Sequence, residues 1–264
     1  MEDIERDLLE VQILRTNPYS KMLTRLQGED DPEPIQRVFL TGANPFVLKT
    51  EKLLEIAALI HKYLPSVESI GCFARITDSV NKTDEELLQL RQAGYNGLTI
   101  GVETGDDAAL SFMRKGYTSS DILTQCKRLE QADIEYGFFY LTGISGKGRG
   151  EAGAKASAEV FNQLHPFLVG PNMLTIYPES DLYQEIQNGN WEEEGELEKY
   201  RELRTLVENL NISTYFAAMG ASNAFQLRGK LPEEKENLLA SLDRIISEVN
   251  EEDLRRYRRD LRHL

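Results

Sequence analysis

The stretch GLTIGVETGDDAALSFMRKGYT, residues 97 to 118, shows how this chain is built. It starts with a short apolar run at 97–103, turns through a glycine and two aspartates, and continues with a helical pattern. Thr118 and the residues after it form a second helix start. A short apolar run bounded by turn residues is typical of a strand in a parallel sheet that is buried on both faces. The stretch therefore predicts a strand followed by helices that pack on a sheet.

The same unit is repeated on both sides of this stretch. Further strands are expected at 35–41, 67–74, 134–143 and 172–177, and helices at 51–63, from Thr83 to Gly94, and at 151–164. Strands that alternate with helices of this length predict an α/β fold with parallel strands. We expect a partial (β/α)6 TIM-like barrel, with a strand-like segment at 213–218 followed by a loop at 220–232.

The chain changes character after its first 190 residues. Residues 192–202 carry six acidic residues against two basic ones and begin a helix that reaches about Leu210, and another helix is expected from Glu233 to Val249. We therefore divide the chain into a barrel core at 1–190 and a helical C-terminal extension at 191–264 that packs on the core.

Composition excludes several classes of protein. The 264 residues have a formal net charge of −14 and a pI near 4.8, so a phosphate backbone is not attracted in general and nucleic acid is an unlikely partner. No apolar run is long enough to span a membrane, and the first ten residues do not resemble a signal peptide. The two cysteines, Cys72 and Cys126, lie far apart, which suits a reducing compartment. A cytoplasmic location is expected.

Polar and glycine-rich loops follow the predicted strands. They are 41-TGANPF-46, 101-GVETGDD-107, 142-TGISGKGRG-150 and 177-YPESD-181. In parallel α/β folds the loops at the carboxyl ends of the strands form the ligand crevice. A binding site is therefore expected where these loops meet.

These motifs resemble the core of the radical S-adenosylmethionine (SAM) superfamily, and more narrowly its branch with an Elp3/MiaB/NifB-like core. The most specific piece is Gly101 to Thr118, which resembles a Gly-hydrophobic-Glu-Ser-Gly strand end, a helix and a Lys/Arg-Gly-x-Thr segment. Ser222-Asn223, Leu227-Arg228-Gly229 and Leu231-Pro232 are similar to a C-terminal signature of one subgroup. The resemblance covers about residues 1 to 250.

The resemblance implies a set of SAM-binding residues. Gly42, Ala43 and Asn44 stand where the family has a Gly-Gly-Glu-Pro loop that receives the SAM amino group, and Asn44 departs from the Glu of that loop. Glu103 corresponds to the carboxylate that binds the SAM ribose, and Arg75 could pair with the SAM carboxylate. Gly143 and Ile144 match a loop that contacts adenine, and Tyr177 could line the adenine or the substrate.

Each of these residues also has a simpler interpretation. The turn at 42–45 could be an ordinary strand-to-helix connection, and Glu103 could cap the helix that begins at Asp106. Arg75 could form a salt bridge with Glu103. The loop 142–150 with Lys147 and Arg149 could be an anion nest, which would make the protein a phosphate-binding TIM-like barrel.

A radical SAM enzyme uses a [4Fe-4S] cluster held by a Cys-x3-Cys-x2-Cys loop, and these 264 residues contain no such motif. Cys72 and Cys126 are expected to be small buried side chains, so no metal ligand and no catalytic residue is assigned. Two explanations stay open. Either the chain is a truncated form of a cluster-dependent enzyme, or it is a SAM-binding or non-catalytic partner protein without a cluster. A protein partner could cover the open edge of the barrel beside residues 35–41.

Overall fold

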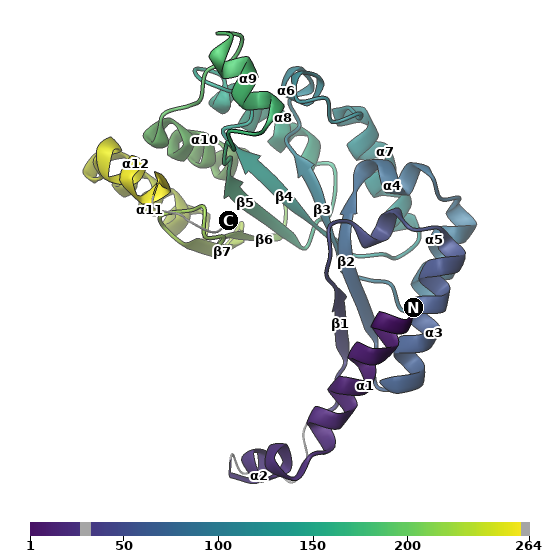
Figure 1. Ribbon diagram of the computed structural model, residues 1–264. Helices are drawn as coiled ribbons and strands as arrows, with labels where there is room; N and C mark the ends of the chain where they lie inside the picture. The colour runs from purple at the N-terminus through teal and green to yellow at the C-terminus, as the bar shows by residue number, and fades with distance from the viewer. Residues whose placement is uncertain (27–32, 260–264) are drawn as a thin grey trace.

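The computed structural model describes residues 1–26 and 33–259, and within them seven strands form one curved sheet (Figure 1). The strands lie in chain order, β1 to β7, and the first six are parallel. The seventh strand is antiparallel to the sixth. The parallel α/β partial barrel expected from the sequence is thus confirmed. The strands are β1 Arg37–Leu40, β2 Ser69–Arg75, β3 Leu98–Glu103, β4 Tyr136–Thr142, β5 Leu168–Met173, β6 Thr214–Ala218 and β7 Leu227–Leu231.

Helices connect the strands, and several begin where the sequence predicts. The Thr83 side chain accepts a hydrogen bond from Glu86 N, and Glu86 accepts one from Thr83 N, which is a capping box. Thr118 and Asp121 form the same arrangement. The helices are α1 Glu2–Thr16, α2 Pro18–Leu26, the 3-10 turn η1 Pro45–Val47, α3 Thr50–Tyr63, α4 Ile76–Val80, α5 Asp84–Gln92, α6 Asp107–Phe112, α7 Ser119–Gln131, α8 Gly150–Phe161, α9 Asp181–Gln187, α10 Glu196–Asn209, α11 Lys235–Glu248 and α12 Glu251–Arg259.

The two faces of the sheet differ in burial. In β3 the residues alternate, so that Leu98, Ile100 and Val102 are fully buried while the residues between them are only partly buried. The apolar residues of α3, α5, α7 and α8 belong to the same core as the buried residues of the strands. The expectation that the strands are buried on both faces was therefore wrong for β3. Its other face stays partly open, as a partial barrel allows.

Two strands differ from the prediction. The fifth strand was expected at 172–177 but lies at Leu168–Met173, because pairing with Gly137–Thr142 of β4 sets its position. Residues 227–231 were expected in a loop but form β7, which pairs with β6. Pairing across a sheet is decided by contacts distant in sequence, which a local pattern does not contain.

The division at residue 190 remains a proposal. The segment after it adds β6 and β7 to the same sheet, and α10 packs on α8 of the preceding part. Within residues 1–26 and 33–259, none of the helices combines the length and the apolar character that crossing a membrane requires.

Candidate functional site

A cavity of about 260 Å³ opens at the carboxyl ends of the first strands. The turn after β1 contributes Ala43, the end of β2 contributes Arg75, and β3 ends in the cavity with Glu103. The segment after α6 closes another side. The full lining consists of Ala43, Phe73, Ala74, Arg75, Thr99, Gly101, Glu103, Arg114, Lys115, Tyr117 and Phe139. Three of the residues expected at the site, Ala43, Arg75 and Glu103, are thus brought together.

Glu103 sits at an irregular strand end. Its φ is +59°, in the left-handed region that side chains other than glycine rarely adopt, and the pairing register with β4 shifts between Gly101 and Glu103. Its Oε1 lies 3.5 Å from where a Cβ on Gly101 would be. The strained backbone therefore turns the carboxylate back over the β3 backbone and into the cavity. Such an outlier is a reason to look for function at the position.

The carboxylate of Glu103 is paired with a lysine. Lys115 Nζ lies 2.9 Å from Glu103 Oε1, and both side chains are about three-quarters buried. The alternative in which Glu103 pairs with Arg75 is not what the structure shows. Nor does Glu103 cap the next helix, since Asp106 Oδ1 accepts hydrogen bonds from Ala108 N at 2.9 Å and Ala109 N at 3.3 Å. The Glu103 carboxylate therefore has no helix to cap.

Sequence reasoning missed the lining residues that the segment after α6 contributes, Arg114, Lys115 and Tyr117. The Tyr117 hydroxyl donates to the carbonyls of Gly101 and Val102 and so holds the end of β3. Burial, followed by the charge of Glu103, raises the pKa of Tyr117 well above its ordinary value, so the phenol stays protonated. Lys115 and Tyr117 belong to the Lys-Gly-x-Thr segment that carries the family resemblance. The sequence analysis used this segment to identify the family and did not assign its side chains to the cavity.

The turn at Gly42, Ala43 and Asn44 follows β1 and is hydrogen-bonded to α4, the helix that follows β2. Gly42 has a φ of +118°, which glycine tolerates best. Asn44 Nδ2 donates to Asp78 Oδ1 at 3.2 Å, while Asp78 Oδ2 accepts from Arg75 N at 2.7 Å. A glutamate could not make the first bond, because its carboxylate has no proton to donate at neutral pH. Asn44 Oδ1 is buried and lacks a hydrogen-bond partner among the described residues. Gly42 and Asn44 are not part of the cavity lining and instead line a groove beside β1, whereas Ala43 lines both.

Besides Gly42 and Asn44, three more of the expected residues do not line this cavity, namely Gly143, Ile144 and Tyr177. Gly143 N donates to Glu202 Oε2 at 2.7 Å, Ile144 is buried, and Tyr177 lies exposed beyond β5. Gly143 and Ile144 directly follow β4, so they lie at the same end of the sheet as the cavity. The structure separates these three residues from Ala43, Arg75 and Glu103.

The two cysteines do not fit a cluster. Cys72 in β2 and Cys126 in α7 are both completely buried. Burial raises the pKa of the Cys72 thiol to about 12 and that of Cys126 further, so the thiolates that iron requires are disfavoured. The part of the chain that the structure describes holds no group of three or more metal-ligating side chains.

The loop that could form an anion nest is filled by groups of the protein itself. Gly148 N donates to Glu198, and Lys147 N donates to the Glu192 carbonyl at 2.9 Å. The Lys147 side chain pairs with the Glu192 carboxylate. Two N–H groups and the lysine of this loop are therefore occupied by groups of the protein itself, which weighs against a phosphate site with Lys147 and Arg149.

Known proteins resemble this chain in part of its sequence and in its fold. Over 115 residues the chain is 24% identical to the heme chaperone HemW of Bacillus subtilis (strain 168). This aligned stretch covers 44% of this chain and 30% of HemW. It thus spans less than a third of the length of this curated relative. The structure resembles the archaeal Elp3 of Methanocaldococcus infernus with residues 1–46 deleted, with a TM-score of 0.56, 11% identity, and coverage of 86% of this chain and 57% of the other.

It also resembles the radical SAM enzyme coproporphyrinogen III oxidase (HemN) of Escherichia coli. The TM-score is 0.55 at 13% identity, over 78% of this chain and 44% of the other. At such identities these two likenesses concern the fold alone. The family model described as Radical SAM superfamily matches residues 21–152, half of the chain, and this range includes Ala43, Arg75 and Glu103. The chain belongs to the radical SAM superfamily.

Proposed function

We propose that this chain binds SAM in the cavity at the carboxyl ends of β1 to β3. The observation that carries the proposal is that Glu103, turned inward by its left-handed backbone, shares one cavity with Arg75 and Lys115. A carboxylate and cations at one strand-end site match a ligand with ribose hydroxyls at one end and an amino acid at the other. Family membership supports the same ligand.

Each residue has a proposed task. Glu103 accepts hydrogen bonds from the two ribose hydroxyls, and Arg75 pairs with the SAM carboxylate. Asn44 Oδ1 and the backbone at Gly42 and Ala43 receive the SAM ammonium, which needs acceptors and little side-chain bulk. The partnerless Asn44 Oδ1 therefore compensates in part for the missing glutamate charge.

The cavity holds only part of SAM. Its 260 Å³ is below the roughly 300 to 1,000 Å³ of pockets for small molecules. We propose that adenine extends toward the carboxyl end of β4, where Gly143 and Ile144 lie, and that Tyr177 lines the adenine or the substrate. The substrate itself stays undefined, because one fold serves many reactions.

A [4Fe-4S] cluster, when bound, supplies one electron to the SAM sulfonium in this superfamily. Cys72 and Cys126 do not fit as its ligands, because both thiols are buried and their pKa values are raised by burial. We propose that radical chemistry requires ligands from outside these 264 residues. The alternative is a SAM-binding or non-catalytic partner protein, for which the residues proposed to hold SAM would be the same.

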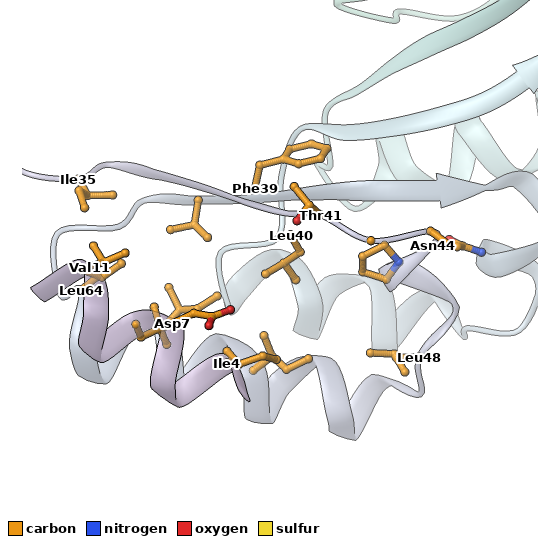
Figure 2. Close-up of a pocket in the computed structure, with 17 residues that line it drawn as sticks. Ile4, Asp7, Val11, Ile35, Phe39, Leu40, Thr41, Asn44, Leu48 and Leu64 are labelled. Atoms are coloured by element: carbon orange, nitrogen blue, oxygen red, sulfur yellow. The ribbon is translucent and has the colours of Figure 1, made fainter. Parts of the chain in front are cut away.

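A second proposal concerns the open edge of the sheet. Among the described residues β1 pairs only with β2, and a groove of about 650 Å³ runs between α1, α3 and β1 (Figure 2). Its lining is apolar apart from the charge of Asp7 and the polar turn at Thr41 and Asn44. An unpaired edge beside an apolar groove is a hazard for aggregation, so we propose that an extended protein segment covers it.

Anaerobic calorimetric titration tests the main proposal. The chain is titrated with SAM and, separately, with a sugar phosphate. We expect saturable binding of SAM and none of the phosphate. Tight phosphate binding without a response to SAM would replace our proposal by the phosphate-binding alternative.

A further inference from the structure

The partly open face of β3 continues across the other strands. Pairing registers place one row of residues side by side on this open face, from β2 to β7. Ala217 belongs to the row because it follows Phe216, which pairs with Val169 of β5. The row consists of Arg75, Gly101, Phe139, Gly170, Ala217 and Arg228. It begins and ends with an arginine, and its other members are small except for one phenylalanine.

Aromatic rings meet on the open face. The centroids of the Phe39 and Phe73 rings lie 5.0 Å apart in an edge-to-face arrangement, and those of Phe73 and Phe139 lie 6.2 Å apart. A Cβ on Gly170 would lie 3.2 Å from the Phe139 ring, so this ring leans toward β5 over the space that the glycine leaves. Phe139 stays partly exposed there. The rings therefore form an apolar surface that another aromatic group can contact.

The charge of the open face differs from that of the whole chain. The chain has a net charge of −14. Among the described strand residues of the open face, four are basic and Glu103 is the single acid, and Glu103 is already paired with Lys115. The basic residues are Arg37, Arg75, Arg228 and Lys230. The open face therefore attracts an anion in a protein whose overall charge repels anions.

Arg228 is a cation of this face to which the proposed function gives no task. It is exposed, and within the described part of the chain its guanidinium takes part in no hydrogen bond or ion pair. Three strand spacings separate it from Phe139, which is about 14 Å along the sheet at about 4.8 Å for each spacing. Gly170 and Ala217, which lie between them in the row, leave room above the sheet. This stretch fits a flat group whose anionic end meets Arg228.

We propose that the open face from β4 to β7 binds a small aromatic carboxylate. Its ring lies against Phe139 over Gly170 and Ala217, and its carboxylate pairs with Arg228. Phe139 also lines the cavity proposed for SAM, so the two ligands lie side by side. That this carboxylate is the substrate of the chain rests on the proposed function, whereas its binding to the open face does not.

Titration of the full 15N-labelled chain with 2-naphthoate, followed by backbone amide NMR shifts, tests this site. We expect saturable shifts at Gly170 and Ala217 with a Kd on the order of 1 mM. The cation 2-naphthylmethylammonium has the same rings and the opposite charge, and should bind at least about tenfold more weakly. Decahydro-2-naphthoate keeps the charge and the carbon skeleton without aromatic rings, and should bind about two- to tenfold more weakly.

Variants locate the two contacts. Arg228→Gln should weaken naphthoate binding about tenfold through loss of a charge-assisted pair, and should bind SAM as the wild type does. Ala217→Leu should weaken naphthoate binding as strongly, because the larger side chain occupies the place of the ring. Arg201→Gln changes an exposed arginine of α10, whose apolar residues pack in the core, and is the matched control. Circular dichroism shows that each variant is folded.

Naphthoate affinity that is unchanged in Arg228→Gln, or shifts that lie outside β4 to β7, would overturn the site. SAM binding without naphthoate binding would overturn this inference and leave the proposed function intact. Naphthoate binding without SAM binding would contradict the proposed function, while the site on the open face stands. Competition between the two ligands would overturn their side-by-side arrangement. A dimer in analytical ultracentrifugation that Ala217→Leu dissociates, with no response to naphthoate, would assign the open face to a second copy of the chain.

Discussion

Replacing Glu103 by alanine should weaken SAM binding without unfolding the protein. The carboxylate faces the cavity from the end of β3 and is the acceptor proposed for the two ribose hydroxyls. Hydrogen bonds to a charged group contribute about 1.5 to 3 kcal/mol each. In the free protein, however, Lys115 already holds Glu103 Oε1 at 2.9 Å, and ligand binding must give up part of that contact.

The net loss is therefore expected at about 1 to 3 kcal/mol, since part of the gain is offset by Lys115. At 1.4 kcal/mol for each factor of ten, this corresponds to a Kd about 5- to 150-fold larger. The stability of the fold should change little, because the two side chains of the ion pair remain partly exposed to solvent, and pairs of this kind contribute about 1 kcal/mol or less.

Calorimetry with SAM gives the affinity, and a thermal melt followed by circular dichroism shows whether the variant is folded. Glu135→Gln is a matched control, because Glu135 precedes β4 at the opposite end of the sheet and bonds to Asn96. The control should bind SAM as the wild type does. A folded Glu103→Ala protein with unchanged affinity would remove Glu103 from the site.

Three further predictions concern the stability of the fold. Gly105→Ala should destabilise the protein by about 1 to 3 kcal/mol in urea unfolding, because the added Cβ would lie 2.7 Å from Ser157 Cα. An unchanged urea midpoint would contradict this close packing. Thr118→Ala should cost about 1 kcal/mol in the same assay through loss of the N-cap of α7, whereas Thr118→Ser should retain most of the stability. Burial raises the pKa of Glu194 to about 7, so its contribution to the free energy of unfolding is present below pH 4.5 and is lost as the pH rises through about 7. The free energy of unfolding of Glu194→Gln should therefore fall less, or rise more, than that of the wild type over this range, and parallel curves would show that Glu194 does not titrate there.

The sequence predicted the parallel fold because the signals for its elements are local. Thr83 and Thr118 each precede a helix and have an acidic residue three positions later, and both capping boxes are present. The shift of β5 to 168–173 and the existence of β7 were missed because both depend on pairing with distant strands. Local patterns do not contain that information.

At the candidate site the sequence indicated Glu103 but not its partner. Lys115 lies beyond α6, and only the folded chain brings it to Glu103. The contacts of the acidic segment 192–202 with the loop 143–150 were missed for a similar reason. A run of acids is usually exposed, and nothing local showed that Glu194 and Glu202 would be buried under the loop 143–150. Asn44 was a departure from the family pattern, and its bond to Asp78 became visible only in the structure.

A crystal structure of the chain with SAM bound tests the central claim most directly. The account predicts electron density for SAM in the cavity between Ala43, Arg75 and Glu103, with both ribose hydroxyls at hydrogen-bonding distance from the Glu103 carboxylate and the methionine end toward Asn44. Density for SAM at another place on the molecule, with Glu103 still paired only to Lys115, would contradict it.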